Sequence, residues 1–293
     1  MIASTKALAR TARAGGYAIP AVNVFDEISM RAVIDAAVRA QAPMIIQIST
    51  KTARTSGVGF VTELFTALTR NVAVPVALHL DHCPDREMVS AVMNARWSSV
   101  LFDASDRDLD AAVRETTEVT AQAAPLGIDV ESEIENILGV EDGVGSDDAH
   151  HSYSIADLAS IAVQTCADLI APQLGTSHGL YKASPKLLPE RAAELVALTD
   201  IPVVLHGGTG LREEDFRAFI TAGVSKINIS TAVKHAYMQA SLAHLETAKQ
   251  TDTWDPPALV SDISRAVTAT ITELITWFGA DGRAGEHMGR AQK

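Results

Sequence analysis

Short apolar runs rich in Val and Ile recur along the chain, and an amphipathic stretch follows most of them. The runs are unbroken rather than alternating, which is typical of strands buried on both faces of a parallel sheet. Eight runs predict strands, at 17–22, 44–48, 75–79, 99–102, 127–131, 168–172, 202–206 and 225–229.

The stretches between these runs have apolar residues at helical spacing and are rich in Ala, Glu and Arg. They predict helices at 27–40, 85–96, 106–124, 155–167, 188–199, 212–222 and 259–278. A short amphipathic helix is expected before the first strand. Segment 139–152 is rich in Gly, Ser and acids and has no periodicity, so it predicts a mobile loop after the fifth strand.

Strand–helix alternation repeated eight times predicts an α/β fold, a single (β/α)8 TIM-barrel domain over residues 1–293 with a C-terminal helical extension. A doubly wound open sheet is the alternative. The barrel is favoured because eight units fit closure and no GxGxxG follows the first strand.

Charge and cysteine content narrow the classes of function. The chain has 24 Lys and Arg against 36 Asp and Glu, a net charge of −12, which argues against a general nucleic-acid binder. It leaves open a small anionic substrate, which a few backbone N–H groups can hold. The two cysteines are far apart, and no apolar run approaches the ~18 residues of a membrane span. We therefore expect a soluble, cytoplasmic protein without membrane partners.

Polar residues follow the predicted strands at the end where a barrel builds its active site. Three of them, His82, His178 and His206, come from three strand ends, and a catalytic zinc takes three protein ligands and one open position. Any one of these histidines could instead be an ordinary core or loop residue. His79 lies two residues before Asp81, on the same face and deeper, and is expected in the core.

Two segments rich in Gly and hydroxyl residues, GTSHG and HGGTG, let the backbone turn sharply and approach a ligand closely. Further hydroxyls follow the eighth strand at Ser230 and Thr231. Loops after the seventh and eighth strands are a frequent phosphate position in this fold. Phosphate binding is therefore one interpretation of these segments.

In order along the chain, HLDH, FDAS, ExE, GxEDG, GTSHGLY, PVVLHGGTG and GVSKINIST resemble the class II, zinc-dependent ketose-bisphosphate aldolases. Fructose- and tagatose-bisphosphate aldolases are the best-known members. The resemblance covers nearly the whole chain. It implies an aldehyde-lyase that forms or cleaves a ketose phosphate with dihydroxyacetone phosphate as one partner.

The resemblance also implies roles for individual residues. His82, His178 and His206 would hold Zn2+, Asp81 would exchange a proton with the C4 hydroxyl, and Glu141 would move the C3 proton. Asp103 and Glu133 match positions that can hold a second divalent metal or a monovalent cation. Positions that match substrate or phosphate contacts are Asn23, Ser49, Gly179, Gly207, Gly208, Thr209, Asn228, Ile229, Ser230 and Thr231.

The chemistry agrees with a metal route. Aldol cleavage leaves negative charge on oxygen, which a zinc ion can stabilise as a Lewis acid. The other strategy is a Schiff base on a lysine. The strand ends offer no well-placed lysine except Lys226, which lies at the start of a predicted strand.

The sequence departs from the family pattern at several positions. Glu135 and Leu138 replace loop glycines, and Pro257 replaces an Arg associated with the phosphate at the aldehyde end. Arg54 or Arg283 could take over that role. Fructose or tagatose 1,6-bisphosphate is the default substrate, and a ketose 1-phosphate without a distal phosphate is the variant.

Two other readings are open. A zinc hydrolase would normally carry HxH at the end of the first strand, where this chain has Ala21-Val22-Asn23. A non-catalytic barrel subunit need not keep the complete set of polar residues. The apolar stripe of 259–278 predicts a homo-oligomer, dimer or tetramer, unless that stripe covers the barrel itself.

Overall fold

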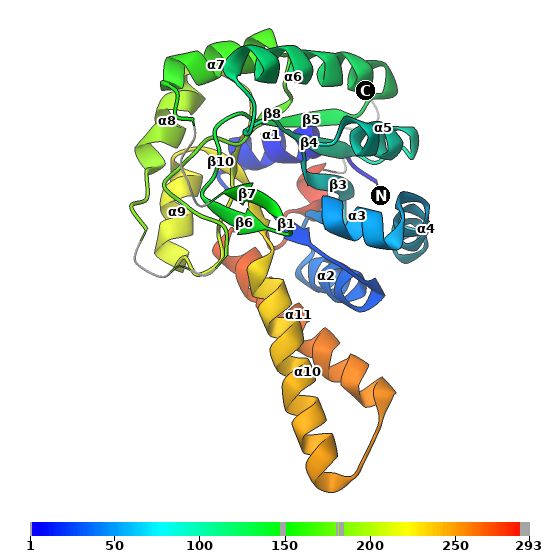
Figure 1. Cartoon of the computed structure of the whole chain (residues 1–293). Coiled ribbons are helices and arrows are strands. Elements are labelled where there is room, and N and C mark those ends of the chain that lie inside the picture. Colours follow the sequence, from blue (N-terminus) through cyan, green and yellow to red (C-terminus); the bar gives the residue numbers. More distant parts are fainter. Residues whose placement is uncertain (1, 147–150, 180, 182–184, 288–293) are drawn as a thin grey trace.

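The computed structural model describes residues 2–146, 151–179, 181 and 185–287, and eight of its strands form a closed parallel barrel (Figure 1). The order around the barrel is β1-β10-β9-β8-β5-β4-β3-β2. The predicted (β/α)8 barrel is confirmed. Its strands are β1 Ile19–Asn23, β2 Met44–Ser49, β3 Val76–Cys83, β4 Ser99–Asp103, β5 Asp129–Glu133, β8 Leu169–Ile170, β9 Val203–Leu205 and β10 Val224–Ile229.

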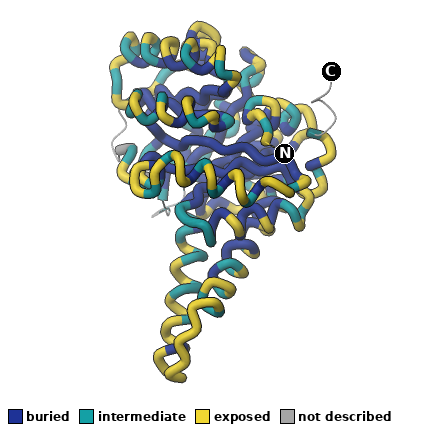
Figure 2. Tube along the Cα trace, turned by 90° about the vertical axis from the view of Figure 1, so that its right-hand side faces the viewer, coloured by how far each residue is buried: buried dark blue, intermediate teal, exposed yellow. Residues whose placement is uncertain are grey.

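Helices surround the barrel, and every residue of the barrel strands is buried between them and the interior (Figure 2). This double burial is the reason for the unbroken apolar runs. The helices are α1 Thr5–Gly15, α2 Glu27–Ala40, α3 Thr50–Ser56, α4 Val58–Thr69, α5 Arg86–Asn94, α6 Leu109–Ala123, α7 Ile155–Gln164, α8 Pro189–Leu198, α9 Glu213–Thr221, α10 Thr231–Thr251 and α11 Pro256–Trp277.

Short polar side chains cap the first turns of helices α2 and α3, which follow strands β1 and β2 at the mouth of the barrel. Ser49, the last residue of β2, accepts a hydrogen bond from the backbone N–H of Thr52 in α3. Asp26 and Ser29 form a reciprocal cap at the start of α2. These caps satisfy N–H groups that a helix start leaves free.

The segment expected to be a mobile loop contains a β-hairpin, which corrects the prediction. Strands β6 Gly139–Glu141 and β7 Val144–Ser146 pair antiparallel. The turn residues Asp142 and Gly143 have φ of +51° and +89°. Positive φ at both turn positions is the geometry that Asp-Gly supplies in a two-residue hairpin, and it twists as paired strands do.

Helices α10 and α11 extend away from the barrel as an antiparallel pair (Figure 1). We call residues 238–262 the arm. The apolar stripe of α11 packs inside the chain, because Ile263, Val267 and Ile271 are buried and Thr268 donates to the carbonyl of Ala32 in α2. This stripe is therefore not available to a second copy, and an oligomer needs another surface.

Among the residues that the structure describes, no helix combines the length and the apolar character needed to cross a membrane.

Candidate active site

The rings of His82, His178 and His206 come together at the carboxyl ends of the strands. The centroid of the His82 ring lies 4.8 Å from that of His178 and 4.7 Å from that of His206. One nitrogen from each imidazole lies within 4.8 Å of the others. The structure thus gathers the three predicted metal ligands.

A bulge in β3 directs two consecutive side chains into the mouth. Successive residues of a strand normally point to opposite faces. The pairing of β3 with β4 shifts register between Leu80 and Cys83, and His82 has a φ of +37°. Thr50 donates its hydroxyl proton to the backbone carbonyl of His82 and supports this conformation. The bulge explains how Asp81 and His82 serve one site.

Carboxylates orient two of the imidazoles. Nδ1 of His82 lies 3.1 Å from Oδ2 of Asp103, and Nε2 of His206 lies 2.9 Å from Oε1 of Glu131. The other two nitrogens, Nε2 of His82 and Nδ1 of His206, face each other at 3.0 Å. A metal ligand needs an unprotonated nitrogen, so with a metal bound each ring would direct its N–H to the carboxylate and its inner nitrogen to the metal.

The charge at the site fits a divalent cation. Four carboxylates are buried here, those of Asp81, Asp103, Glu131 and Glu133. Among the described residues, Lys226 is the one Lys or Arg that is buried. Buried charges require partners, and three imidazole nitrogens are the donor set of a catalytic zinc site. A second group, His82, Asp103 and Glu133, also gathers potential ligand atoms within 4.8 Å.

Protonation follows from this crowding of charge. Burial lowers the pKa of His82, but the carboxylates of Glu133, Asp81 and Asp103 outweigh burial and raise it well above its usual value. Burial and the neighbouring cations lower the pKa of His206. Burial also raises the pKa of Glu133, and Asp103 adds to this effect. The pKa of Asp103 is about 2, because the hydrogen bond and charge of His82 overcome burial.

Two amide side chains hold the carboxylate of Asp81. Asn23 donates to Oδ2 at 2.7 Å, and Asn228 donates to Oδ1 at 3.3 Å. Gln47, to which no motif in the sequence points, donates to Oδ1 of Asn23 at 2.8 Å and fixes the direction of the Asn23 amide. Asn23, proposed as a contact on the substrate side, is 3% exposed and holds Asp81.

The segments expected to bind phosphate meet at the start of α10. The hydroxyl of Thr209 accepts a hydrogen bond from the backbone N–H of Ala232, and this bond joins the HGGTG loop to α10. Gly207 has a φ of +68°, and an added Cβ would lie 2.4 Å from the carbonyl oxygen of Ser177. Tyr181, which was not among the predicted contacts, donates its hydroxyl proton to the Gly207 carbonyl. Ser230 and Thr231 lie where β10 passes into α10.

Other predicted contacts have different surroundings. The hydroxyl of Ser49 is engaged at the start of α3, where it also donates to Thr52. Gly179 has a φ of +87°, and none of the described residues has an atom within 4 Å of a Cβ added there. Ile229 is buried as the last residue of β10.

The hairpin that carries Glu141 lies against the His178 segment. The backbone N–H of His178 donates to the Leu138 carbonyl at 2.7 Å, and Leu138 pairs with Ser177. A Cβ at Gly139 would lie 2.7 Å from the carbonyl oxygen of His178. Lys234 of α10 pairs with Asp142 at 2.9 Å. The backbone of Glu141 is in β6, and its side chain lies outside the described atoms.

Comparisons with known proteins agree with this arrangement. Residues 3–283 match the family described as fructose-bisphosphate aldolase class-II. The chain is 33% identical to the fructose-bisphosphate aldolase of Geobacillus stearothermophilus over 97% of its length and 99% of that protein. It is 32% identical to a fructose-bisphosphate aldolase of Staphylococcus epidermidis over 97% and 99% of the two chains.

A solved structure shares both the fold and part of the sequence. The YdjI aldolase from Escherichia coli K12 superimposes with a TM-score of 0.82 at 27% identity. The match covers 97% of this chain and 100% of the other.

Proposed function

The chain belongs to the class II fructose-bisphosphate aldolase family and is a lyase, and we propose that it reversibly cleaves a ketose (bis)phosphate to dihydroxyacetone phosphate and an aldehyde. One observation carries the proposal. Three imidazoles that can hold a metal lie beside a carboxylate, Asp81, that two amides fix in place. We propose that all of 1–293 serves as one aldolase unit.

Each chemical task has a candidate residue. A zinc ion held by His82, His178 and His206 would supply Lewis-acid stabilisation of the negative oxygen that cleavage creates. Asp81, whose oxygens are fixed by Asn23 and Asn228, accepts the C4 hydroxyl proton in the cleavage direction. Glu141 moves the C3 proton. Its hairpin is tied to the His178 segment, which supports a position at the mouth.

The start of α10 supports binding of the triose phosphate. Backbone N–H groups at a helix N-terminus and in the adjoining glycine loop favour an anion. Gly207 and Gly208 leave the backbone of the HGGTG loop uncovered by side chains, and Thr209 follows them in the chain. The hydroxyls of Ser230 and Thr231 stand where β10 passes into α10. Gly179, which has a positive φ and follows His178, would join this pocket. Asp103 and Glu133 would take a second cation beside His82.

The residues considered for the aldehyde end lie in three different places. Pro257 is at the tip of the arm, and 21 residues of α10 separate that tip from the mouth, which is about 30 Å at the helical rise. Arg283 stacks over Tyr17, which precedes β1 at the opposite end of the barrel. Arg54 lies at the mouth in α3 and pairs with Asp85. Arg54 is therefore the better candidate for a distal phosphate.

A substrate panel tests the function. We expect zinc-loaded protein to release dihydroxyacetone phosphate from fructose or tagatose 1,6-bisphosphate. Arg54→Ala should lower kcat/KM for the bisphosphates by roughly 10–150-fold and leave ketose 1-phosphates unaffected. Arg283→Ala is the matched control and should change neither. If the wild type cleaves ketose 1-phosphates as fast as the bisphosphates, its substrate belongs to the class without a distal phosphate. If no ketose phosphate in the panel yields triose phosphate, the proposal is refuted.

Removal of one imidazole tests the metal site. His178→Ala should lose zinc and activity together, because three protein ligands are needed. Elemental analysis of the dialysed protein measures the metal. A full zinc content in this variant would show that the ligands are assigned wrongly.

Removal of Asp81 tests proton transfer. The alternative role, orienting His82, is filled by Asp103, which lies 3.1 Å from His82 Nδ1. We therefore expect Asp81→Ala to keep zinc and triose phosphate binding and to lower kcat by ~10²–10⁴-fold. Weakened zinc binding with proportionate loss of activity would assign Asp81 to the metal instead.

We also propose a reducing, cytoplasmic setting, which the two free cysteines support: Cys83 is buried and Cys166 exposed, with no disulfide between them.

A further inference from the structure

A buried ion pair crosses the barrel interior beneath the three imidazoles. Nζ of Lys226 lies 2.8 Å from Oε2 of Glu131, and both side chains are fully buried. Lys226 is on β10 and Glu131 on β5, and β9 and β8 separate these two strands around the barrel. The pair therefore joins two walls of the barrel that share no backbone hydrogen bonds.

Each partner of the pair contacts a group of the proposed site. Glu131 uses its other oxygen, Oε1, to hold Nε2 of His206 at 2.9 Å. Besides this ion pair, Lys226 donates a hydrogen bond, at 2.7 Å, to Oδ1 of Asn228. The amide nitrogen of Asn228 is the one that donates to Asp81.

We propose that Lys226 is a positioning residue that orients His206 through Glu131 and Asp81 through Asn228. The inference rests on the proposed metal site and does not depend on which ketose phosphate is cleaved.

The orientation of His206 depends on which nitrogen carries its proton. For Nδ1 to face a metal with a lone pair, Nε2 must be protonated and needs an acceptor. Glu131 Oε1 at 2.9 Å is that acceptor. The amide nitrogen of Asn228, 3.0 Å from the same Nε2, is a donor and cannot serve. Lys226 sets the orientation of the Asn228 amide. It donates a hydrogen bond to Oδ1 of Asn228, so the amide nitrogen is turned toward Asp81.

The neighbours of Glu131 show why the ammonium group matters. Nε2 of His79 lies 3.9 Å from Oε2 of Glu131, and its Nδ1 is hydrogen-bonded to the hydroxyl of Ser99. Burial and the charge of Lys226 lower the pKa of His79, so this ring does not supply positive charge. A buried carboxylate that loses its only cation is strongly disfavoured and changes its contacts. Without Lys226, therefore, Glu131 no longer holds His206 in the same way.

The same pair argues against the ordinary alternative for a lysine in an aldolase. A Schiff-base lysine needs a free amine that can reach the substrate carbonyl. Lys226 is 0% exposed, and its ammonium group is engaged by Glu131 and Asn228. Its place is below the imidazoles rather than in the mouth.

Zinc affinity of the isolated protein provides the test. Chelator competition should show zinc binding weakened ~10–100-fold in Glu131→Gln and in Lys226→Met, the usual effect of losing a group that orients a metal ligand. The absorption bands of bound Co2+ should shift in both variants. Ser225→Ala is the matched control, because Ser225 is a buried neighbour on β10 that the strand alternation turns to the other face.

The double variant Lys226→Met/Glu131→Gln guards against misfolding, because it leaves no unpaired charge. Its zinc affinity should equal that of Glu131→Gln, since the two residues act as one unit. At saturating zinc, Lys226→Met should lower kcat with little change in KM, because Asn228 loses the donor that fixes its amide beside Asp81.

Two results would overturn the proposal. One is that the double variant and Glu131→Gln both keep the zinc affinity and the Co2+ spectrum of the wild type. The other is a covalent adduct on Lys226 after borohydride treatment with dihydroxyacetone phosphate, which would give the lysine a chemical role. If wild-type protein cleaves no ketose phosphate but the zinc results hold, the proposed function fails and the positioning role stands.

Discussion

Backbone and side-chain constraints coincide in His82. Its φ of +37° is rare for a residue with a side chain and costs on the order of 1–3 kcal/mol. The bond from Thr50 to its carbonyl and the contact of Nδ1 with Asp103 hold it there. The strain is explained by the need to place two neighbouring residues, Asp81 and His82, in the same mouth.

Protonation of His82 gives the metal site a pH dependence. The surrounding carboxylates raise its pKa well above the usual value, so the metal-free protein carries a proton there at neutral pH. A metal and a proton compete for the inner nitrogen, and binding must release the proton. Zinc affinity should therefore rise about tenfold per pH unit below that pKa and level off above it.

Competition titrations between pH 6 and 8 measure this slope, and calorimetry in buffers of different ionisation heat counts the protons released. His244→Ala, which removes a histidine on the arm that pairs with Asp262, should leave the slope unchanged. Zinc affinity that is flat with pH would mean that His82 is already neutral.

The elements of the barrel follow from the sequence because their pattern is local. Double burial makes each strand an apolar run, and α2 spans the predicted residues 27–40. The end of β3 was less predictable. The run was expected to end at residue 79, but β3 continues to Cys83, because Ser49 of β2 pairs with Asp81. Polar residues can continue a strand when their backbone forms hydrogen bonds with a neighbouring strand. That neighbour is distant in sequence, so a local pattern does not reveal where the strand ends.

The candidate site divides in the same way. Residue type and position after a strand indicated the three histidines and Asp81, and the structure brings these together. Glu131 belongs to the ExE motif at the end of the fifth predicted strand, but its contact with His206 comes from another strand and has no local signal. Gln47 acts through Asn23 on a neighbouring strand, so no local pattern points to it. The hairpin of β6 and β7 did leave a signal, the Asp-Gly pair at its turn.

An ion pair between a buried carboxylate and a partly exposed arginine anchors the segment around this hairpin. Glu135, one of the departures from the family glycines, is buried and accepts both contacts from Arg191 at 2.9 and 3.0 Å. The Glu135 carboxylate also accepts hydrogen bonds from the backbone N–H groups of Tyr153 and Gln173. The carboxylate thus joins the end of β5 to the segments before α7 and α8, a task that glycine could not perform.

Arg191→Met should destabilise the protein markedly, because it leaves the Glu135 carboxylate buried without its cation. We expect a loss of about 3 kcal/mol in the free energy of unfolding, measured by urea denaturation. Arg212→Met is the control: it removes an exposed pair with Asp215 and should lower the free energy of unfolding far less, because solvent screens exposed charges. Similar small effects from both substitutions would show that the backbone contacts alone hold the segment.

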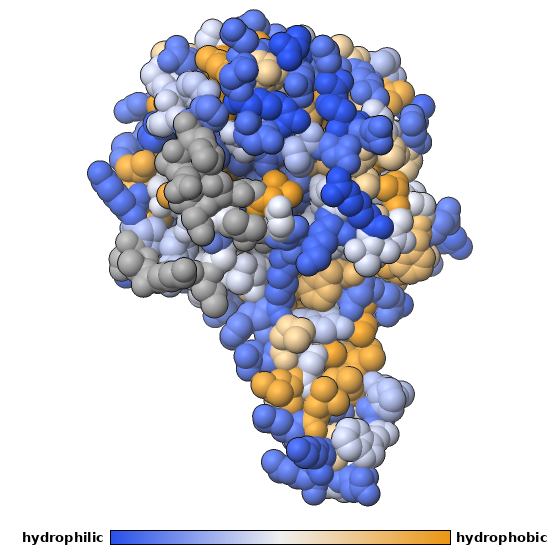
Figure 3. Space-filling model, viewed as in Figure 1, coloured by the Kyte–Doolittle hydropathy of each residue, from blue (hydrophilic) through white to orange (hydrophobic). Residues whose placement is uncertain are grey.

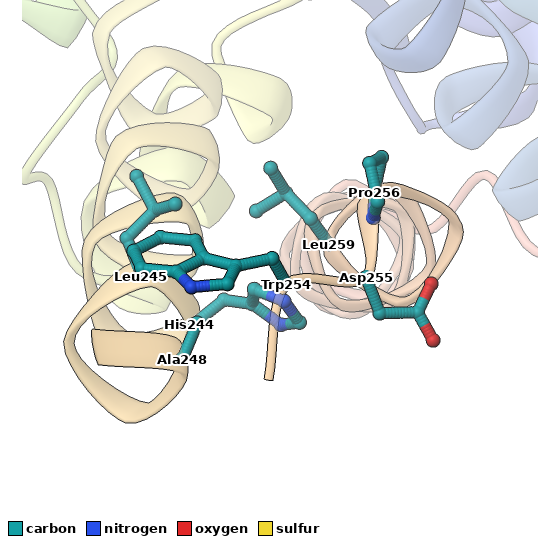
Figure 4. A pocket seen from close by; sticks show the side chains of 7 residues that line it. All are labelled: His244, Leu245, Ala248, Trp254, Asp255, Pro256 and Leu259. Atoms are coloured by element: carbon teal, nitrogen blue, oxygen red, sulfur yellow. The ribbon is translucent and has the colours of Figure 1, made fainter. Parts of the chain in front are cut away.

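At the scale of the whole molecule, apolar side chains gather on the surface of the arm in the view of Figure 3. Met238, Leu242 and Leu245 follow one another at helical spacing on α10, each about half exposed or more, with Trp254 and Val260 nearby. A small pocket opens between the two helices, where Trp254 lies over Leu245 and Leu259 (Figure 4). A contiguous apolar patch of this kind marks a contact surface.

We expect the chain to form a homo-oligomer, a dimer or tetramer, through the arm. Light scattering at micromolar concentration should give a multiple of 31.1 kDa for the wild type and a single-chain mass for Leu242→Glu. Val163→Glu, at an exposed apolar residue of α7 outside the arm, is the matched control and should keep the wild-type mass. A wild type of single-chain mass would exclude the oligomer, and an unchanged mass for Leu242→Glu would exclude the arm as its interface.

Helix α10 has a different neighbour at each end. Its first residues adjoin the proposed phosphate segments, its Lys234 holds Asp142 in the turn of the Glu141 hairpin, and its far half carries the apolar patch. A helix is stiff, so freeing one end changes the mobility of the other. If copies join through the arm, turnover per chain should depend on the protein concentration. Chains that separate on dilution keep every active-site residue, but each chain turns over more slowly.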